Sequence, residues 1–69
     1  MDMIEVVEAG RDSITLRHIG TGHVFAYAVE AGDLVPGRVT EGPGPKDPGD
    51  VAADVHAVAK REAKSRGLI

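Results

Sequence analysis

The sequence predicts an α+β fold, in which a small antiparallel β-sheet of three or four strands (residues 3–40) precedes one C-terminal α-helix (residues 48–66). Three observations predict it. Apolar and polar residues alternate with a period of two over residues 14–18, as in a half-buried strand. A Pro/Gly-rich segment over residues 41–49 ends the strand pattern. Small apolar residues then recur at helical spacing.

The whole chain is expected to form a single small domain over residues 1–69, because 69 residues are too few for two domains. It divides into a sheet (residues 1–40), a Pro/Gly-rich linker (41–49), and an amphipathic helix with an apolar C-terminus (50–69). A core of this size rarely contributes more than about 3–5 kcal/mol of stability. The chain contains no Cys, which excludes disulfides as reinforcement. A partner chain is therefore favoured.

Four segments are predicted to be strands: residues 3–8, 14–18, 23–29 and, as a short edge strand, 38–40. Gly-rich turns separate the first three segments. Pro36 argues against a central position for the fourth strand, because proline has no N–H group to donate to a sheet ladder.

The register of the second and third strands follows from a four-residue loop over residues 19–22. It pairs Leu16 with Phe25 and Ile14 with Tyr27, which gathers the large residues on one face. This large face contains Ile14, Leu16, Phe25, Tyr27 and Val29, and an odd-length turn at residues 10–12 adds Ile4 and Val6. The opposite face carries Ser13, Thr15, Arg17, Val24, Ala26 and Ala28. Its small residues Val24, Ala26 and Ala28 make it flat enough for a close neighbour, either the helix or a second copy of the sheet.

The linker has three Pro and three Gly among its nine residues, so neither a helix nor a sheet ladder is expected there. It is interpreted as a spacer with no reason to bind the core. Such a spacer permits the helix to pack on its own sheet or on that of another copy.

The helix is predicted from its two ends. Asp47 and Pro48 form a start signal, Asp50 adds a carboxylate to the first turn, and Gly67 is a plausible C-cap. Between the ends lies a thin apolar stripe of small residues, namely Val51, Ala52, Val55, Val58, Ala59 and Ala63. Leu68 follows the cap and is expected to tuck against the sheet or a partner.

Composition and motifs argue against several function classes. The absence of Cys excludes thiolate zinc sites and cysteine nucleophiles. No nucleophile motif, acid–base pair or substrate pocket is identifiable, so we expect a non-catalytic protein without a cofactor. No apolar run approaches the roughly 18 residues of a membrane span, and no signal peptide is visible, so we expect a cytoplasmic protein with no membrane partner. A chain rich in Ala, Gly, Val and Arg and without Asn or Gln resembles the products of high-GC genomes, such as those of actinobacteria and their phages.

The function expected from these features is a small protein-interaction or oligomerisation module. Its sheet and tethered helix would dock on another protein or on a second copy, which makes a homo-oligomer the expectation. The residues expected to bind the partner are the larger apolar ones of the helix and the C-terminus: Val51, Val55, Val58, Leu68 and Ile69.

One alternative is a small regulator associated with nucleic acid. Residues 1–54 carry ten acidic and four basic side chains, whereas residues 55–69 carry one acidic and four basic ones. The basic end of the helix, with Lys60, Arg61, Lys64 and Arg66, would then contact phosphates.

The second alternative is a histidine-based metal site. His18 and His23 flank the predicted turn and face each other across it, and cross-strand neighbours have Cβ atoms about 4.5–5.5 Å apart. The simpler expectation is that both imidazoles flank an exposed turn and are solvated.

Overall fold

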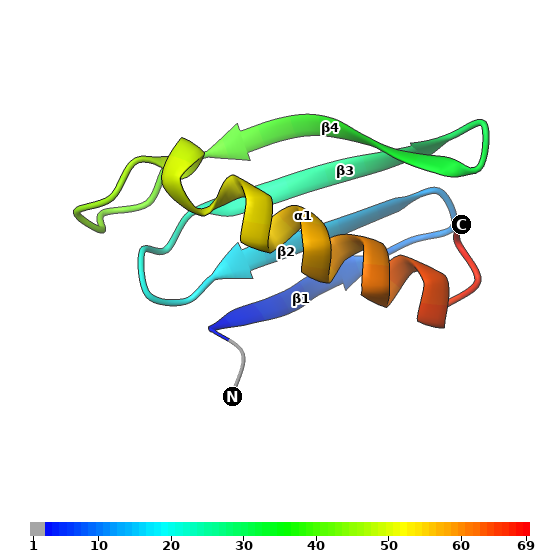
Figure 1. Ribbon diagram of the computed structural model, residues 1–69, viewed down its shortest axis with the longest axis horizontal. Coiled ribbons are helices and arrows are strands. Elements are labelled where there is room, and N and C mark those ends of the chain that lie inside the picture. Colours follow the sequence, from blue (N-terminus) through cyan, green and yellow to red (C-terminus); the bar gives the residue numbers. More distant parts are fainter. Residues whose placement is uncertain (1–2) are drawn as a thin grey trace.

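One helix lies across one face of a four-stranded antiparallel sheet in the computed structural model, which describes residues 3–69 (Figure 1). The strands follow one another in the order β1-β2-β3-β4, and each pairs with its neighbour in the sequence. The elements are β1 (Ile4–Ala9), β2 (Ser13–His18), β3 (Val24–Glu30), β4 (Asp33–Thr40) and α1 (Pro48–Ser65). The predicted α+β arrangement is confirmed.

The predicted register between β2 and β3 is also confirmed. Ile14 pairs with Tyr27 and Leu16 pairs with Phe25, so the large residues share one face. On β1, Val6 pairs with Leu16 and packs against the core. The pairing of β1 with β2 shifts between Val6 and Glu8, which marks a β-bulge.

The fourth strand is longer than predicted. It begins at Asp33 rather than at residue 38, and Leu34 pairs with Val29 while Pro36 pairs with Tyr27. Pro36 is tolerated because β4 is an edge strand, as the sequence indicated. The pairing shifts opposite Phe25 and Tyr27, so this edge also contains a bulge.

The helix packs on the large face of the sheet and forms the core with it. The buried apolar residues are Ile14, Leu16, Phe25, Tyr27 and Leu34 from the sheet, and Val51, Val55, Ala59 and Ala63 from the helix. The alternative that the helix covers the small face is therefore wrong. The large face has more apolar area to remove from water, and the small helix residues let α1 approach it closely.

Local capping fixes both ends of the helix. At the start, the carboxylate of Asp50 accepts a hydrogen bond from the main-chain N–H of Asp47 at 3.3 Å. At the end, Gly67 has a φ of 75°, and the N–H of Leu68 donates to the carbonyl of Ala63 at 2.8 Å. This is a Schellman motif, and it directs Leu68 back onto the core.

The Pro/Gly linker is bound to the sheet, contrary to the expectation of a free spacer. The N–H of Gly44 donates to the carbonyl of Thr21 at 2.9 Å. A Cβ atom on Gly42 would lie 2.3 Å from the carbonyl carbon of Gly22, and one on Gly44 would lie 2.4 Å from the Cα of Thr21. The linker therefore lies directly against the β2–β3 turn, and the helix that follows it packs on its own sheet.

Within residues 3–69, α1 is not apolar enough to cross a lipid bilayer.

Candidate functional site

The sheet face opposite α1 is not covered by any described residue, and Figure 1 shows the helix on the other side. We call it the open sheet face and define it as Thr15, Val24, Ala26, Ala28 and Val35. The cross-strand pairs of Thr15 with Ala26 and of Ala28 with Val35 place these residues together. These five side chains are all small or β-branched, and Val35 is 38% exposed.

Charges border the open sheet face on the β1 side. Glu5 pairs with Arg17 in the register of β1 and β2, and their side chains form a salt bridge. Glu8 pairs with Thr15 one step further along. The open sheet face thus has charged side chains along its β1 side, and polar rims of this kind are common in protein interfaces.

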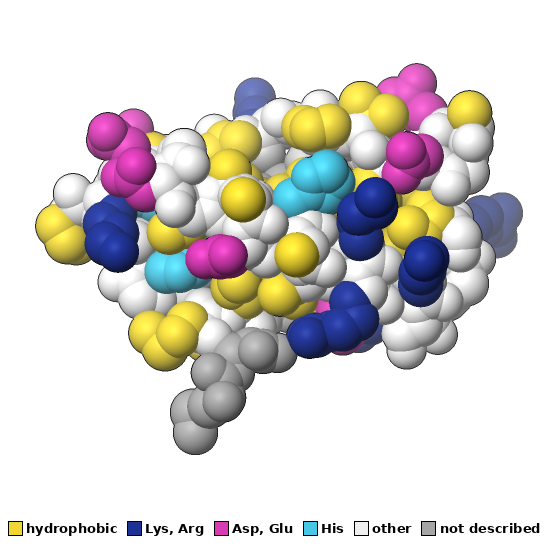
Figure 2. Space-filling view, in the orientation of Figure 1, with side chains coloured by type: hydrophobic (Ala, Val, Ile, Leu, Met, Phe, Trp, Pro, Cys, Tyr) yellow, Lys and Arg dark blue, Asp and Glu magenta, His cyan; other side chains and the backbone are white. Residues whose placement is uncertain are grey.

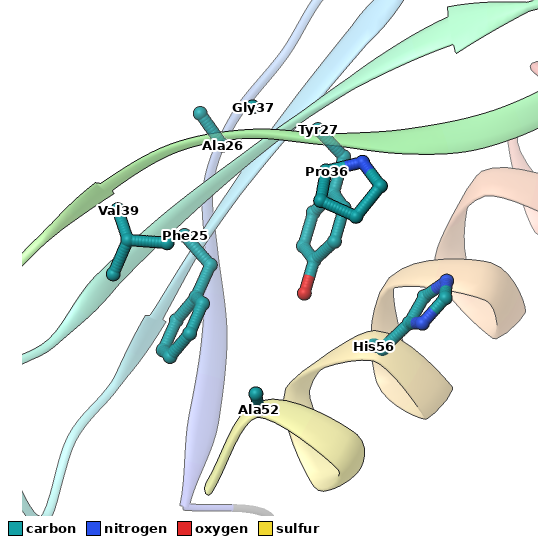
Figure 3. A pocket seen from close by; sticks show the side chains of 8 residues that line it. All are labelled: Phe25, Ala26, Tyr27, Pro36, Gly37, Val39, Ala52 and His56. Carbon is teal, nitrogen blue, oxygen red and sulfur yellow. The ribbon is translucent and has the colours of Figure 1, made fainter. Parts of the chain in front are cut away.

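A small pocket opens on the other side of the sheet, between β3, β4 and the first half of α1 (Figure 3). Its volume is about 140 Å³. The lining residues are Phe25, Ala26, Tyr27, Pro36, Gly37, Val39, Ala52 and His56. None of them is Asp, Glu, Lys or Arg. The pocket lies where the pairing of β3 with β4 shifts between Phe25 and Tyr27.

Two rings form the polar part of this pocket. The imidazole of His56 stacks on the phenol ring of Tyr27, with ring centroids 5.5 Å apart and planes inclined by 18°. The Nε2 atom of His56 is buried and has no hydrogen-bond partner among the described residues. Burial raises the pKa of the Tyr27 hydroxyl above its ordinary value of 10.0, because the phenolate would lose hydration.

His23 is fully buried, so the expectation of two solvated histidines is wrong for this residue. The main-chain N–H of Gly42 donates to His23 Nδ1 at 2.8 Å, and His23 Nε2 donates to the carbonyl of Lys46 at 2.6 Å. The Nδ1 atom must accept, because its partner is an N–H group. His23 is therefore a neutral imidazole protonated at Nε2.

The proposed metal pair is not arranged for metal binding in this fold. Both ring nitrogens of His23 are engaged by the main chain, and Nδ1 of His18 lies 3.0 Å from the hydroxyl oxygen of Thr21. Among residues 3–69, no three His, Cys, Asp or Glu side chains form a group that could hold a metal ion.

The residues predicted to bind a partner mostly serve the core of this chain. Val51 and Val55 are buried beneath the helix, while Val58, Leu68 and Ile69 are partly buried and pack against the core. A partner would reach Val51 or Val55 only if the helix left its own sheet.

The basic residues gather on the C-terminal half of α1, on the face seen in Figure 2. Glu62 neutralises part of this cluster, because it pairs with Arg66 at 2.6 Å and with Arg61 at 3.7 Å. Lys60 and Lys64 are exposed. A continuous phosphate-binding surface is therefore smaller than the four residues suggested.

Sequence reasoning missed the pocket and the role of His23. Ala52 and His56 lie four residues apart beside the buried stripe, so helical spacing already placed them on one flank. The bulge between β3 and β4 lies beside the same pocket, and only Pro36 and Gly37 mark it in the local sequence. No known family model, no curated protein and no solved structure matches this chain.

Proposed function

We propose that this chain is a non-catalytic interaction module whose partner is a second copy of itself, docked through the open sheet face. The observation that carries the proposal is the uncovered face itself. On this face Val35 is exposed and Ala26 and Ala28 are half-buried, whereas the face beneath α1 is packed. Covering such a surface removes apolar area from water and stabilises the assembly.

The dimensions of the molecule support a dimer of ordinary size. The principal extents of the molecule are 34, 24 and 18 Å, so its broad side is large enough to contain the roughly 800 Å² that each partner buries in a standard interface. A flat surface of small side chains is also easily self-complementary, as a two-fold interface requires. Two such sheets stack face to face about 10 Å apart.

The two edges of the sheet are poorer sites for association. Both β1 and β4 contain a bulge, and β4 also contains Pro36. Bulges and proline interrupt the row of N–H and C=O groups with which another strand would pair. Association through the face is therefore favoured over extension of the sheet at its edges.

The proposal keeps the expected function but changes the surface. The sequence placed the contact on the helix and the C-terminus, which in this fold complete the core. No described residue covers the small face of the sheet. A second copy of the sheet is one of the two neighbours that the sequence favours for this face. The nucleic-acid alternative has less support, because Glu62 pairs with two of the four basic residues.

The test is sedimentation velocity of the purified chain from micromolar to millimolar concentrations. We expect a monomer–dimer equilibrium in the wild type and a monomer for Ala28→Arg, because the arginine would bring an unpaired charge into the apolar contact. Ala57→Arg is the matched control. It adds the same charge on the exposed side of α1 and is expected to leave the dimer unchanged.

Circular dichroism must show that each variant is folded. A wild type that remains monomeric throughout would contradict self-association and direct the search to a different partner protein. An Ala28→Arg variant that still dimerises would show that the interface lies elsewhere.

A further inference from the structure

We propose that the pocket between β3, β4 and α1 binds a neutral, single-ring aromatic molecule that carries one hydrogen-bonding group. The pocket opens on the helix side of the sheet and shares only Ala26 with the open sheet face, so the inference does not require the proposed dimer (Figure 3). Its volume, its lining and one unpartnered nitrogen carry the argument.

The volume limits the ligand to about one ring. At about 140 Å³ the pocket is below the roughly 300–1,000 Å³ of sites for drug-sized molecules. It is close to the roughly 150 Å³ apolar cavity that accommodates benzene in another protein. A six-membered ring with one small substituent therefore fits, and a fused or extended ligand does not.

The lining selects a neutral aromatic compound. Phe25, Pro36 and Val39 contribute apolar surface, and no charged side chain lines the pocket to compensate an ionic ligand. Burying an unpaired charge is strongly unfavourable, so cations and anions are disfavoured. Stacked Tyr27 and His56 contribute aromatic surface, and aromatic rings pack well at centroid distances of about 4.5–7 Å.

The unpartnered nitrogen selects the hydrogen-bonding group. Buried polar atoms are nearly always hydrogen-bonded, yet His56 Nε2 has no partner among residues 3–69. His56 lines the pocket, and its side chain is half-buried, so a ligand seated there lies beside this ring. A ligand hydroxyl would then donate to that nitrogen. Figure 3 shows that the Tyr27 hydroxyl also points toward α1, at the side of the same space.

Phenol is the probe, and binding is followed by backbone amide NMR of the full chain. We expect saturable shifts for the residues that line the pocket. Ala52→Leu should abolish them, because the larger side chain fills the space beside His56. Ala53→Leu is the matched control: it makes the same change at the adjacent, exposed helix position and should bind as the wild type does. Two results would overturn the proposal. One is wild-type chemical-shift changes that rise linearly with phenol concentration and are scattered over the chain, and the other is equal binding of phenol by Ala52→Leu.

A second pair of measurements tests the hydrogen bond. His56→Phe keeps an aromatic ring beside Tyr27 but removes the nitrogen. We expect its affinity for toluene to stay within about twofold, and its affinity for phenol to fall about three- to tenfold, which is the worth of one neutral hydrogen bond. Equal losses for the two probes would overturn the role of His56. Repeating the phenol titration on Ala28→Arg separates this site from the dimer, because binding is expected to survive there.

Discussion

The side chain of His23 links the turn between β2 and β3 to the linker that precedes α1. Its ring nitrogens contact main-chain groups of Gly42 and Lys46, which lie 19 and 23 residues away in the sequence. No residue near His23 in the sequence indicates these partners, so the sequence predicts an exposed histidine at a turn. Only the folded chain brings the linker to it, and that is why its role could not be predicted.

Replacing His23 is expected to destabilise the fold more than any other histidine substitution. His23→Leu fills similar space but leaves the Gly42 N–H and the Lys46 carbonyl without partners, so we expect a loss of about 2–4 kcal/mol. His18→Leu is the control, with an expected loss below about 1 kcal/mol, because one partly buried contact to Thr21 disappears. Urea unfolding curves measure both. Equal losses for the two variants would contradict the assigned role.

Because the phenol group of Tyr27 is buried, we expect the fold to lose stability at alkaline pH. Because burial raises the pKa of Tyr27 in the folded state, the fold binds this proton more tightly than the unfolded chain does. The stability that protonated Tyr27 contributes is fully present below its pKa of about 10 in the unfolded chain. It is lost as the pH rises through the higher pKa of Tyr27 in the folded state. The free energy of unfolding should therefore fall more steeply above pH 10 in the wild type than in Tyr27→Phe.

The ionisation itself can be followed directly. Tyr27 is the only Tyr and the chain has no Trp, so absorbance at the phenolate wavelength reports this one group. A titration midpoint at or below that of free tyrosine would contradict the burial argument.

At the scale of elements, the strands and the helix could be predicted because their signals are local. Alternation placed Leu16 opposite Phe25, and the Asp47-Pro48 start and Gly67 cap bounded the helix nearly correctly. The full length of β4 and the two bulges could not be predicted, because they depend on pairing with a neighbouring strand. The pocket lies beside one of these bulges, so it was missed for the same reason.

The linker is the element whose behaviour differs most from its composition. Glycine and proline suggested a flexible spacer, but two glycines are present because the main chain approaches the β2–β3 turn closely. Gly42→Ala is expected to cost about 1–3 kcal/mol or more, since its Cβ would lie 2.3 Å from the Gly22 carbonyl carbon. Gly49→Ala is the control. Its Cβ meets nothing within 4 Å, so a neutral or slightly stabilising effect is expected.

Thermal unfolding by circular dichroism compares these two variants. If Gly42→Ala and Gly49→Ala unfold at the same temperature, the linker is not packed on the turn, and the helix is then free to leave its own sheet.

The molecule has two layers, the sheet and α1, and its core lies between them. The other face of the sheet and the outer side of α1 are not covered by described residues. Among residues 3–69, four of the nine buried apolar residues are Val or Ala of the helix, so the core is small in volume as well as in number. Small domains of this kind are commonly completed by association. Face-to-face dimerisation would stack the layers as helix, sheet, sheet, helix and give each sheet two packed faces.

This arrangement predicts that stability depends on protein concentration. If the folded state is a dimer, each tenfold rise in chain concentration should stabilise it by about 1.4 kcal/mol per mole of dimer, by mass action. Urea midpoints measured over two decades of concentration should rise for the wild type and for Ala57→Arg, and remain constant for Ala28→Arg. A constant wild-type midpoint would mean that the helix-covered face alone stabilises the fold. The open sheet face would then belong to a contact with a different protein, because a flat apolar surface beside the Glu5–Arg17 ion pair still favours burial.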